Sequence, residues 1–417
     1  MKILYLHQYF NTPEMSGGTR SYEMARRLVA AGHEVHMITS WRNPDRSNDD
    51  WFETVEAGIK VHWLPVPYSN HMSYGERIRA FFRFARQAGE KAKALRGDVI
   101  FATSTPLTIA IPAVSASKKH KVPMVFEVRD LWPELPIAIG ALNNPVLKWA
   151  AKRLELWAYK HSKAVVALSP GMKQGVVNTG YPSAQVATIP NSSDNVEFAH
   201  NEAAAREFRD ARPWLGDRPL LVYTGTFGKI NGVPYLAELA RSLLDINPEI
   251  RILLVGGGQE DSLLKEKGTE LGVLNKNLFV EDRIPKNQMP AVLSAATMAC
   301  SVCIDLPEIR ANSANKFFDA LAAGKPIMLN YGGWQHELIN KHNCGVSLWQ
   351  KPIDKAAQLL ADKITDEAWL QAAGKSSRQL AEEYFDRDKL AAQLEQVLIA
   401  AVEGNSAKAE SIAPGEY

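Results

Sequence analysis

The segment from Asn312 to Ile327, NSANKFFDALAAGKPI, contains residues whose types and spacing suggest a specific chemistry. Small polar residues such as Ser313 and Asn315 are typical of a helix start. Lys316 then falls in the first turn, where the helix dipole disfavours a cation, and Asp319 interrupts the apolar positions. A bound anion above this turn would account for the lysine. The segment therefore predicts a helix start that binds phosphate.

Three glycine-rich loops follow predicted strands, and glycine lets a ligand approach the backbone closely. The loops are PEMSGGTR (13–20), TGTFGKINGV (224–233) and VGGGQED (255–261). None is a P-loop, and the first is not a dinucleotide-binding fingerprint, so ATP hydrolysis and NAD binding are disfavoured. The glycines that we expect to lie against a ligand are Gly17, Gly18, Gly228 and Gly257.

Three basic residues of the second half, Lys229, Arg310 and Lys316, lie near predicted strand ends or helix starts. Taken singly, each also fits a solvated surface charge. Beside the glycine loops, the set favours the neutralisation of a diphosphate. No pair of carboxylates stands in a convincing metal-binding loop, so we expect no metal and no cofactor. Cys300 and Cys303 lie in a predicted buried strand, where they fit as small core residues.

Alternating strands and helices fill the chain and indicate an α/β fold with two Rossmann-like, doubly wound domains. Residues 1–195 are the predicted N-terminal domain, with strands such as KILYLHQYF and DVIFATS. Residues 196–385 are the predicted C-terminal domain, which begins its sheet at PLLVYTGTFG. We expect a helix at about 386–404 to pack back on the first domain, and 405–417 to be a flexible tail. Ligands of such folds bind at the carboxyl ends of the strands, so a cleft between facing domains is expected.

Length and composition agree with two globular domains, because 417 residues exceed the size of one hydrophobic core. Hydrophobic residues make up 46% and charged residues 23%, which is ordinary for a globular protein. No apolar run spans a bilayer and no signal peptide is recognisable, so a cytoplasmic location is the default expectation. Residues 1–198 carry 24 Lys and Arg against 17 Asp and Glu, and the remainder carries 24 against 29.

The order of these motifs resembles glycosyltransferase family 4, the retaining enzymes of GT-B architecture. The motifs are the first glycine loop, RDLWPE, IPNSSD, TGTFGKxxG, VGGG and SANKFFDALAAGKP. The strings FEVRDLWPELPIAIGAL and VVALSPGMK are most similar to the bacterial O-antigen and exopolysaccharide subgroup, which includes fucosamine transferases. The resemblance covers the chain to about Tyr384 and includes the final helix.

The resemblance implies roles for individual residues. Gly17 and Gly18 would touch the donor diphosphate and sugar, Lys229 and Lys316 would bind the diphosphate, and Asp319 would bind the ribose. The chain also departs from the family. Ala311 stands where the first Glu of the E-x7-E motif is expected, and Arg129 replaces the His of the HD pair. The Arg and Lys of the usual GRxxxxKG loop fall on Thr226 and Asn231, which leaves Lys229 as the substitute.

Retaining transfer builds negative charge on the leaving diphosphate, so the cations Lys229, Arg310 and Lys316 would stabilise the transition state. Asp130, which follows a predicted strand, could steer the acceptor hydroxyl, and Arg129 could meet a phosphate. Alternatively, these two residues form an ion pair that caps the next turn. Lesser candidates for substrate contact are Glu14, Arg20 and Glu134, and His7 is either a site residue or a buried core histidine.

The segment 73–96 predicts a helix with an excess of five positive charges. Its apolar residues Ile78, Phe81, Phe82 and Ala85 share one face and its basic residues another, which suits an anionic membrane surface or a packed helix with a solvated basic face. With the membrane interpretation, the enzyme is peripheral on the inner leaflet of the cytoplasmic membrane. The acceptor is then a polyprenyl-diphosphate-linked glycan, and the donor a UDP-sugar such as an N-acetylated hexosamine or deoxyhexosamine.

Two other functions remain open from the sequence. One is a sugar-nucleotide epimerase of GT-B-like fold, which would need catalytic carboxylates and histidines that are scarce here. The other is a non-catalytic module that binds anions or nucleic acid. Nucleic acid is disfavoured as a partner because the second half is acidic and no aromatic residues of an RNA-binding motif accompany the basic helix.

Overall fold

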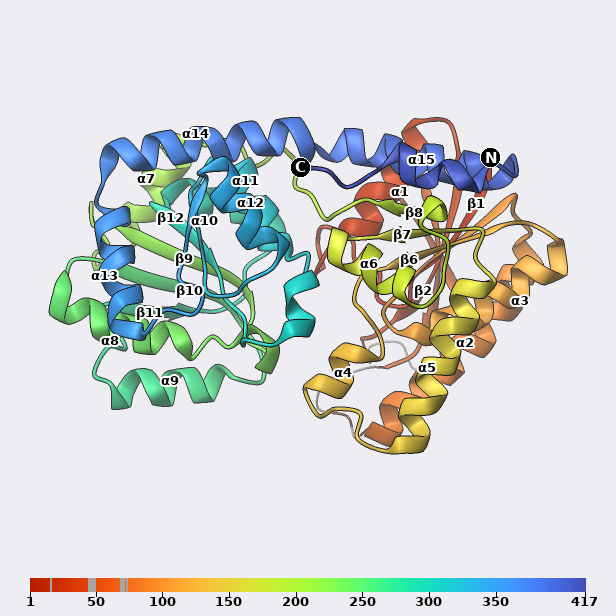
Figure 1. The fold of residues 1–417 in the computed structure, drawn as a ribbon, viewed down its shortest axis with the longest axis horizontal. Coiled ribbons are helices and arrows are strands. Elements are labelled where there is room, and N and C mark those ends of the chain that lie inside the picture. The colour runs from red at the N-terminus through yellow and green to blue at the C-terminus, as the bar shows by residue number, and fades with distance from the viewer. Residues whose placement is uncertain (16, 44–49, 68–71, 73) are drawn as a thin grey trace. The chain divides into compact units, whose positions relative to one another are not determined.

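The computed structural model describes residues 1–417 except 16, 44–49, 68–71 and 73, and it leaves the side chain of Tyr74 undescribed. The chain divides into two compact units. Unit 1 comprises Met1–Thr12, Gly17–Pro190 and Asp388–Glu416, and unit 2 comprises Pro13–Ser16, Asn191–Arg387 and Tyr417. Within the described residues, no helix has the length and apolar character needed to cross a membrane. Each unit is an α/β structure with its own sheet (Figure 1).

Unit 1 is built on an eight-stranded sheet in the order β3-β4-β2-β1-β5-β6-β7-β8, in which only β3 is antiparallel to its neighbour. The strands are β1 (Lys2–Leu6), β2 (Glu34–Trp41), β3 (Phe52–Glu56), β4 (Ile59–Pro65), β5 (Val99–Thr103), β6 (Met124–Val128), β7 (Ala164–Ala167) and β8 (Val186–Thr188). Strands β1, β5, β6 and β7 are almost wholly buried, as expected for parallel strands covered on both faces.

The helices of unit 1 cover both faces of this sheet. They are α1 (Arg20–Ala30), α2 (Tyr74–Leu95), α3 (Ala110–His120), α4 (Glu134–Ala138), α5 (Pro145–Lys160), α6 (Pro170–Asn178), α15 (Arg387–Val402) and α16 (Ala409–Ile412). Crossovers between parallel strands are right-handed. The crossover through α1 runs from β1 to β2, and the crossovers through α2, α3 and α5 run across the sheet in the opposite direction. Helix α1 therefore lies on one face of the sheet, and α2, α3 and α5 lie on the other. Figure 1 shows this arrangement around the strands of unit 1.

The C-terminal residues belong to unit 1. Helix α15 lies against α1, where Arg27 binds Asp388 (2.5 Å) and His33 lies 2.8 Å from Glu395. The sequence predicts a flexible tail at 405–417, and in the structure residues 405–416 belong to unit 1. The tail contains the turn η6 (Ser406–Lys408) and α16, and Glu410 binds Lys173 (2.8 Å). The sequence could not indicate this packing of the C-terminal segment, because the residues that anchor it lie in α6 and β8, more than 200 residues away.

Unit 2 contains a fully parallel sheet in the order β11-β10-β9-β12-β13-β14. The strands are β9 (Leu220–Thr226), β10 (Arg251–Gly257), β11 (Leu278–Glu281), β12 (Met298–Ser301), β13 (Ile327–Leu329) and β14 (Gly345–Ser347). Leu221 and Tyr223 of β9 belong to one hydrophobic core, and Leu220 and Val222 to a second. This alternation follows from the two-residue period of a strand and explains why helices cover both faces.

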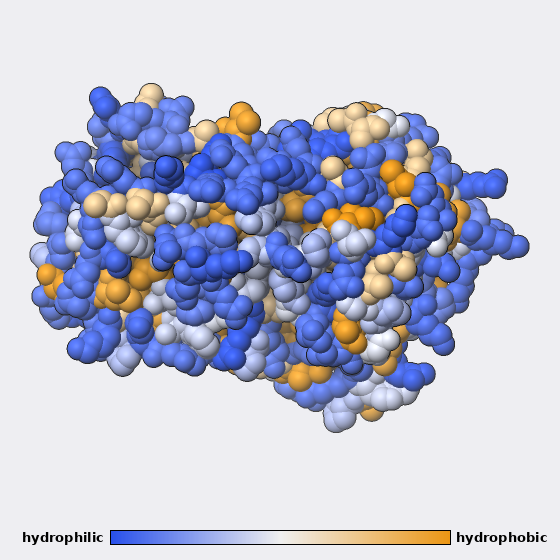
Figure 2. Space-filling model, turned by 45° about the horizontal axis from the view of Figure 1, so that its top comes forward, coloured by the Kyte–Doolittle hydropathy of each residue, from blue (hydrophilic) through white to orange (hydrophobic). Residues whose placement is uncertain are grey.

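Helices fill the connections of unit 2. They are α7 (Glu202–Asp210), α8 (Tyr235–Ile246), α9 (Asp261–Glu270), α10 (Met289–Ala295), α11 (Asn315–Ala322), α12 (Trp334–His342), α13 (Ile353–Ile364) and α14 (Glu367–Tyr384). Figure 2 shows a surface dominated by hydrophilic residues, with apolar residues in small separate groups. All three cysteines are buried free thiols, and Cys303 lies two residues beyond the end of β12.

Strand order reverses at one place in each sheet, and such switch points open a crevice at the carboxyl ends of the two strands. In unit 2 the reversal lies between β9 and β12, and in unit 1 between β1 and β5. The loops after these four strands are therefore the positions at which each unit can hold a ligand.

Candidate active site

Lys316 stands at the switch point of unit 2. It lies in the first turn of α11, and its Nζ donates a hydrogen bond to the hydroxyl of Tyr223 on β9 (2.9 Å) and sits 4.2 Å from the centre of that ring. Burial lowers the pKa of Lys316 below its ordinary value of 10.5. A Cβ on Gly225 would come within 3.3 Å of Nζ, so glycine there leaves room beside the ammonium group. The lysine expected at an anion site is thus fixed at the carboxyl end of β9.

The N-terminus of α11 is not capped by a side chain. Ala314 occupies the cap position, and Asn315, the first helical residue, is exposed and makes no capping hydrogen bond. The amide groups of the first turn, the helix dipole and Lys316 therefore form one positive feature at the switch point. An anionic ligand would supply the missing hydrogen-bond acceptors.

The glycine loops of unit 2 allow the ends of β9 and β10 to approach each other. Any side chain at Gly256 or Gly258 would clash with the neighbouring backbone. A Cβ on Gly256 would lie 1.9 Å from the carbonyl oxygen of Gly225, and a Cβ on Gly258 would lie 2.6 Å from the carbonyl oxygen of Phe227. Gly257 is half-buried, and its carbonyl accepts hydrogen bonds from Phe227 N (3.2 Å) and Arg283 (2.5 Å). The sequence did not indicate this close packing of the two loops. The packing fixes the loop conformations with or without a bound ligand.

Lys229 and Arg310 lie on the loops after β9 and β12. Gly228 precedes η3 (Lys229–Asn231), and the Lys229 side chain is exposed with no ion pair among the described residues. Arg310, in η5 (Pro307–Ala311), lies over the ring of Trp349 at 5.2 Å and 4.0 Å from Asp305. Both cations therefore come from the two loops that flank the switch point.

Asp319 is already engaged within unit 2. Its Oδ1 accepts a hydrogen bond from Ser193 (2.7 Å) and its Oδ2 accepts one from Lys286 (2.6 Å), and the residue is buried. Lys286 was not expected from the sequence, because nothing in its neighbourhood marks it as a partner of α11. A ribose contact at Asp319 stays a prediction, and it would have to use the remaining lone pairs of a carboxylate that holds α11 in place.

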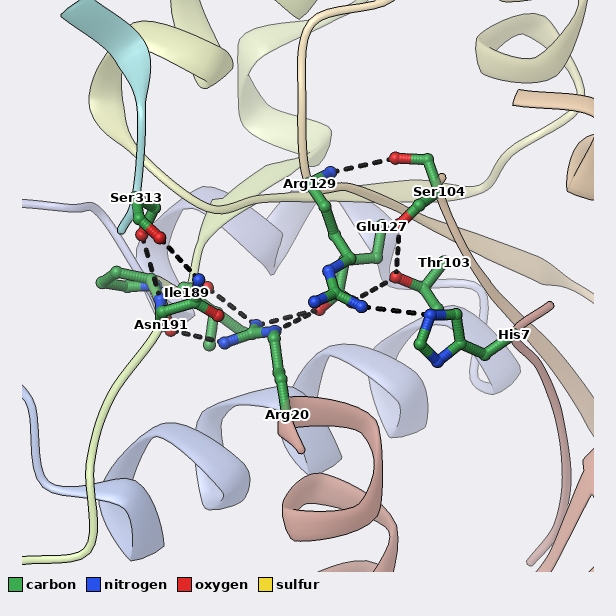
Figure 3. A network of polar contacts seen from close by, with 10 residues as sticks. His7, Arg20, Thr103, Ser104, Glu127, Arg129, Ile189, Asn191 and Ser313 are labelled. Atoms are coloured by element: carbon green, nitrogen blue, oxygen red, sulfur yellow. Dashed lines mark hydrogen bonds and ion pairs between the residues drawn. The ribbon is translucent and has the colours of Figure 1, made fainter. Parts of the chain in front are cut away.

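The IPNSSD motif supports the same helix start. Asn191 donates from its side chain to the Ser313 carbonyl (2.6 Å) and from its backbone N–H to the Ser313 hydroxyl (3.2 Å) (Figure 3). Ser313 is 5% exposed, so its hydroxyl faces Asn191 rather than solvent. Two motifs that are more than 120 residues apart are therefore one structural unit, and Ser313 has a positioning role in the observed contacts.

The switch point of unit 1 brings together His7 after β1, Ser104 after β5 and Arg129 after β6 (Figure 3). Arg129 donates from Nη1 to His7 Nε2 (3.1 Å) and from its backbone N–H to the Ser104 hydroxyl (3.0 Å). His7 is buried, and burial together with the charges of Arg129 and Arg42 holds its pKa well below 6.5. His7 is therefore neutral, with the proton on Nδ1, and it fixes the direction of the Arg129 side chain.

Asp130 follows Arg129 and is only partly exposed. Its carboxylate makes no hydrogen bond or ion pair with any described residue, so the capping pair with Arg129 that the sequence left open is not formed. Burial raises the pKa of Asp130 to about 6, although the charge of Arg129 opposes the shift. A partly buried carboxylate that titrates near neutral pH suits a group that accepts a proton or a hydroxyl hydrogen bond.

Arg20, a lesser candidate for substrate contact, is buried and bound within unit 1, and a contact with substrate stays a prediction. Its guanidinium binds Glu127 Oε1 (2.8 Å) and the carbonyl oxygens of Ile189 (2.8 Å) and Pro190 (Figure 3). Glu127 is fully buried and also accepts a hydrogen bond from Thr103 (2.6 Å). Desolvated charges persist only with such partners, so Arg20 fixes the end of unit 1.

The first glycine loop is anchored by Asn11. The side chain of Asn11 donates to the carbonyls of Tyr9 (3.3 Å) and Gly18 (3.2 Å) and accepts a hydrogen bond from Arg42. Gly17 has φ of 135° and faces the Asn11 side chain, so a side chain there would be strained and would clash. Gly17 and Gly18 are exposed.

The acidic candidates differ in their surroundings. Glu14 is exposed, whereas Glu134 pairs with Lys152 at 2.7 Å. In the described part of the chain, no three His, Cys, Asp or Glu side chains are grouped as metal ligands.

Comparison with protein families matches the description "Glycosyl transferase 4-like domain" at residues 17–192 and "Glycosyl transferases group 1" at residues 205–383. These matches fall on the two sheets described above. The chain is a glycosyltransferase. The glycosyltransferase has the GT-B combination of two Rossmann-like domains, as the sequence predicted.

Relatives agree with this family, and solved structures have a similar fold. The glycosyltransferase is similar to a glycogen synthase of Mycobacterium tuberculosis, with 24% identity over 97% of this chain and 96% of the relative. It is also similar to the GDP-mannose-dependent alpha-(1-6)-phosphatidylinositol monomannoside mannosyltransferase of the same organism, with 23% identity over 92% of this chain and 94% of the relative. The fold is similar to that of Anabaena Alr3699/HepE in complex with UDP-glucose, with a TM-score of 0.71, 17% identity, and coverage of 96% of this chain and 100% of that protein.

Proposed function

We propose that the glycosyltransferase moves a sugar, with retention, from a UDP-sugar to a polyprenyl-diphosphate-linked glycan in the synthesis of a bacterial surface polysaccharide such as O-antigen or exopolysaccharide. The donor sugar is an N-acetylated hexosamine or deoxyhexosamine, as the resemblance to the fucosamine-transferase subgroup suggests. Unit 2 binds the donor and unit 1 the acceptor. The observation that carries this proposal is Lys316 beside the uncapped N-terminus of α11 at the β9–β12 switch point.

The donor diphosphate accepts hydrogen bonds from the first turn of α11 and from Lys316, and Lys229 and Arg310 contribute further positive charge. During transfer, the bond between the anomeric carbon and the diphosphate oxygen breaks, and a bond from that carbon to an acceptor hydroxyl oxygen forms on the same face. The acceptor hydroxyl passes its proton to the departing diphosphate oxygen on that same face. Negative charge grows on the diphosphate, where preorganised positive groups stabilise it most effectively.

On the acceptor side, Asp130 orients the attacking hydroxyl and Arg129 binds a phosphate of the lipid-linked acceptor. His7 supports this role because it holds the guanidinium by accepting its hydrogen bond. The excess of positive charge in residues 1–198 favours an anionic acceptor.

The enzyme works on the cytoplasmic face of the membrane through the 73–96 segment. Ser73 lies outside the described residues. In α2 the exposed face contains Arg79, Phe82 and Arg86, whereas Phe84 and Ala85 are buried. The apolar face therefore differs from the predicted one, because Phe82 lies outside the core and between two exposed arginines. An exposed face that combines an aromatic ring with arginines suits a lipid surface better than a purely basic face.

A panel of nucleotides tests the donor assignment by thermal stabilisation of the protein. UDP and UDP-linked N-acetylhexosamines should raise the melting temperature of the wild type and should stabilise Lys316→Met far less. Lys276→Met is the matched control, because Lys276 is an exposed lysine just before the amino end of the edge strand β11, whereas the candidate site lies at the carboxyl ends of β9 and β12. Stabilisation by GDP-mannose alone would instead favour the donor named for the mannosyltransferase relative, and a lack of response to any nucleotide would refute the proposal.

A further inference from the structure

Large apolar side chains are exposed together at the start of α5. Val146, Leu147 and Trp149 are 69%, 38% and 66% exposed, and they occupy the first five residues of the helix. Folded proteins rarely leave such neighbours in water without a binding role. The site residues described above do not include this surface, so it needs a separate explanation.

The exposed turns are a well-defined part of the helix. Asn144 caps α5 by accepting hydrogen bonds from the N–H groups of Val146 (2.9 Å) and Leu147 (3.2 Å), and Pro145 occupies the first turn. Both features favour a helix start. The helix is attached by its second half, where Glu155, Ala158 and Tyr159 are buried.

The exposed residues share one face of the helix. Val146, Trp149, Ala150 and Arg153 follow the i, i+3, i+4, i+7 spacing, and all four are exposed. Arg153 is the basic residue of this face, whereas Lys148 is partly exposed on another side of the helix. The face therefore combines an indole and aliphatic side chains with a guanidinium group, the composition of a helix that lies in a membrane interface.

Helix α2 adds a similar face on the same side of the sheet. α3 contacts both α2 and α5, so the two helices belong to one layer. Phe82 of α2 is 54% exposed and is flanked by the exposed Arg79 and Arg86. In the described part of the chain, no carboxylate forms an ion pair with Arg79, Arg86, Lys148 or Arg153. These cations can meet anionic headgroups.

We propose that the first two turns of α5 insert into the interface of an anionic lipid bilayer, with Phe82 of α2 as a second contact. The inference rests on the proposed function and specifies the surface with which the enzyme meets its lipid-linked acceptor. Few side chains form the apolar cluster, whereas a stable protein interface uses roughly 20–30 residues on each side. The unpaired cations around it complement lipid phosphates and would repel a second copy of the same basic surface.

Vesicle sedimentation tests the proposal with the full chain. Wild-type protein should bind vesicles that contain phosphatidylcholine and phosphatidylglycerol better than phosphatidylcholine alone. The double variant Val146→Ser/Trp149→Ser should bind about tenfold or more weakly, because it removes most of the apolar area that would be buried. Val55→Ser is the matched control, since Val55 is 71% exposed on β3 in the same unit, and it should bind like the wild type.

The basic residues have their own variant. Arg79→Gln/Arg86→Gln should reduce binding to the anionic vesicles by roughly fivefold per charge and weaken its dependence on salt, with little effect on phosphatidylcholine alone. Equal melting temperatures of variants and wild type would show that the fold is intact.

Stabilisation by UDP is measured on the same preparations, so that failure of the donor assignment and failure of the membrane inference give different results. Unchanged vesicle binding by Val146→Ser/Trp149→Ser overturns the inference even if UDP binds. A wild-type dimer that this variant converts to a monomer, without a change in vesicle binding, assigns the face to a second copy and also overturns it. Loss of vesicle binding with an intact UDP response supports it.

Discussion

Replacement of Lys316 by methionine should separate the binding of phosphate from the stability of the fold. Methionine keeps the length of the apolar stem but removes the ammonium group that donates to Tyr223. Because burial lowers the pKa of Lys316, the charged lysine costs the folded protein free energy at neutral pH. This cost begins to fall as pH rises past the lowered pKa and is gone above the ordinary pKa of 10.5. The variant without ligand should therefore melt at the same temperature as the wild type or higher at pH 7.

The loss of ligand affinity follows from the contact that Lys316 would make. A hydrogen bond between a charged donor and an anion contributes about 1.5–3 kcal/mol, and a partly buried ammonium group is less screened than a surface one. The dissociation constant of UDP should therefore rise by roughly 10–150-fold. Uridine has no phosphate and should bind the variant and the wild type equally. UMP should show a smaller difference than UDP.

Isothermal titration calorimetry of UDP, UMP and uridine against wild type, Lys316→Met and Lys276→Met measures these affinities directly. Lys276→Met should bind all three ligands like the wild type. Equal binding of UDP to Lys316→Met and the wild type would refute the role of Lys316. An equal loss of uridine binding would show that the substitution distorted the site and did not remove a phosphate contact.

Substitutions at three further residues test unit 1. Asp130→Asn should lower turnover by about 10²-fold and abolish the decline in kcat/KM as pH falls through about 6. Because the raised pKa makes the charged carboxylate unfavourable in the folded protein, the variant should also melt at a higher temperature at pH 7. An unchanged pH profile would exclude Asp130 as the group that orients the acceptor hydroxyl. His7→Leu removes the acceptor of the Arg129 hydrogen bond and should reduce activity about tenfold, whereas His7→Gln, whose amide oxygen can replace Nε2, should restore most of it; equal activities would contradict the positioning role. Glu127→Gln leaves Arg20 buried beside a neutral partner and should lower the free energy of unfolding by about 3–5 kcal/mol, measured by denaturant titration, and a loss below about 1 kcal/mol would show that the pair is not structural.

The sequence was sufficient for the fold class and for the lysine at the switch point, for physical reasons. Short apolar runs such as RILLVGGG that alternate with helical patterns are typical of parallel strands buried on both faces, and the segment that connects two such strands is usually a helix. Lys316 was recognisable because a cation in a first helical turn is unfavourable without an anion. Both inferences depend on local patterns of a few residues.

The contacts that fix the site were not accessible in this way. The ribose contact of Asp319 stays a prediction, whereas the hydrogen bonds that its two oxygens accept from Ser193 and Lys286, 126 and 33 residues away, were not predicted. Arg20 was considered only as a substrate contact, and its hydrogen bond with Glu127, 107 residues away, was not predicted. Local sequence patterns do not indicate partners at such distances, and the same holds for the C-terminal segment that α6 and β8 anchor.

The position of the UDP diphosphate in a structure of the complex tests the central claim most directly. The donor assignment predicts a β-phosphate within hydrogen-bond distance of Lys316 Nζ and of the first amide groups of α11, between the ends of β9 and β12. UDP bound away from the β9–β12 switch point, or bound there with its diphosphate directed away from α11, would contradict it.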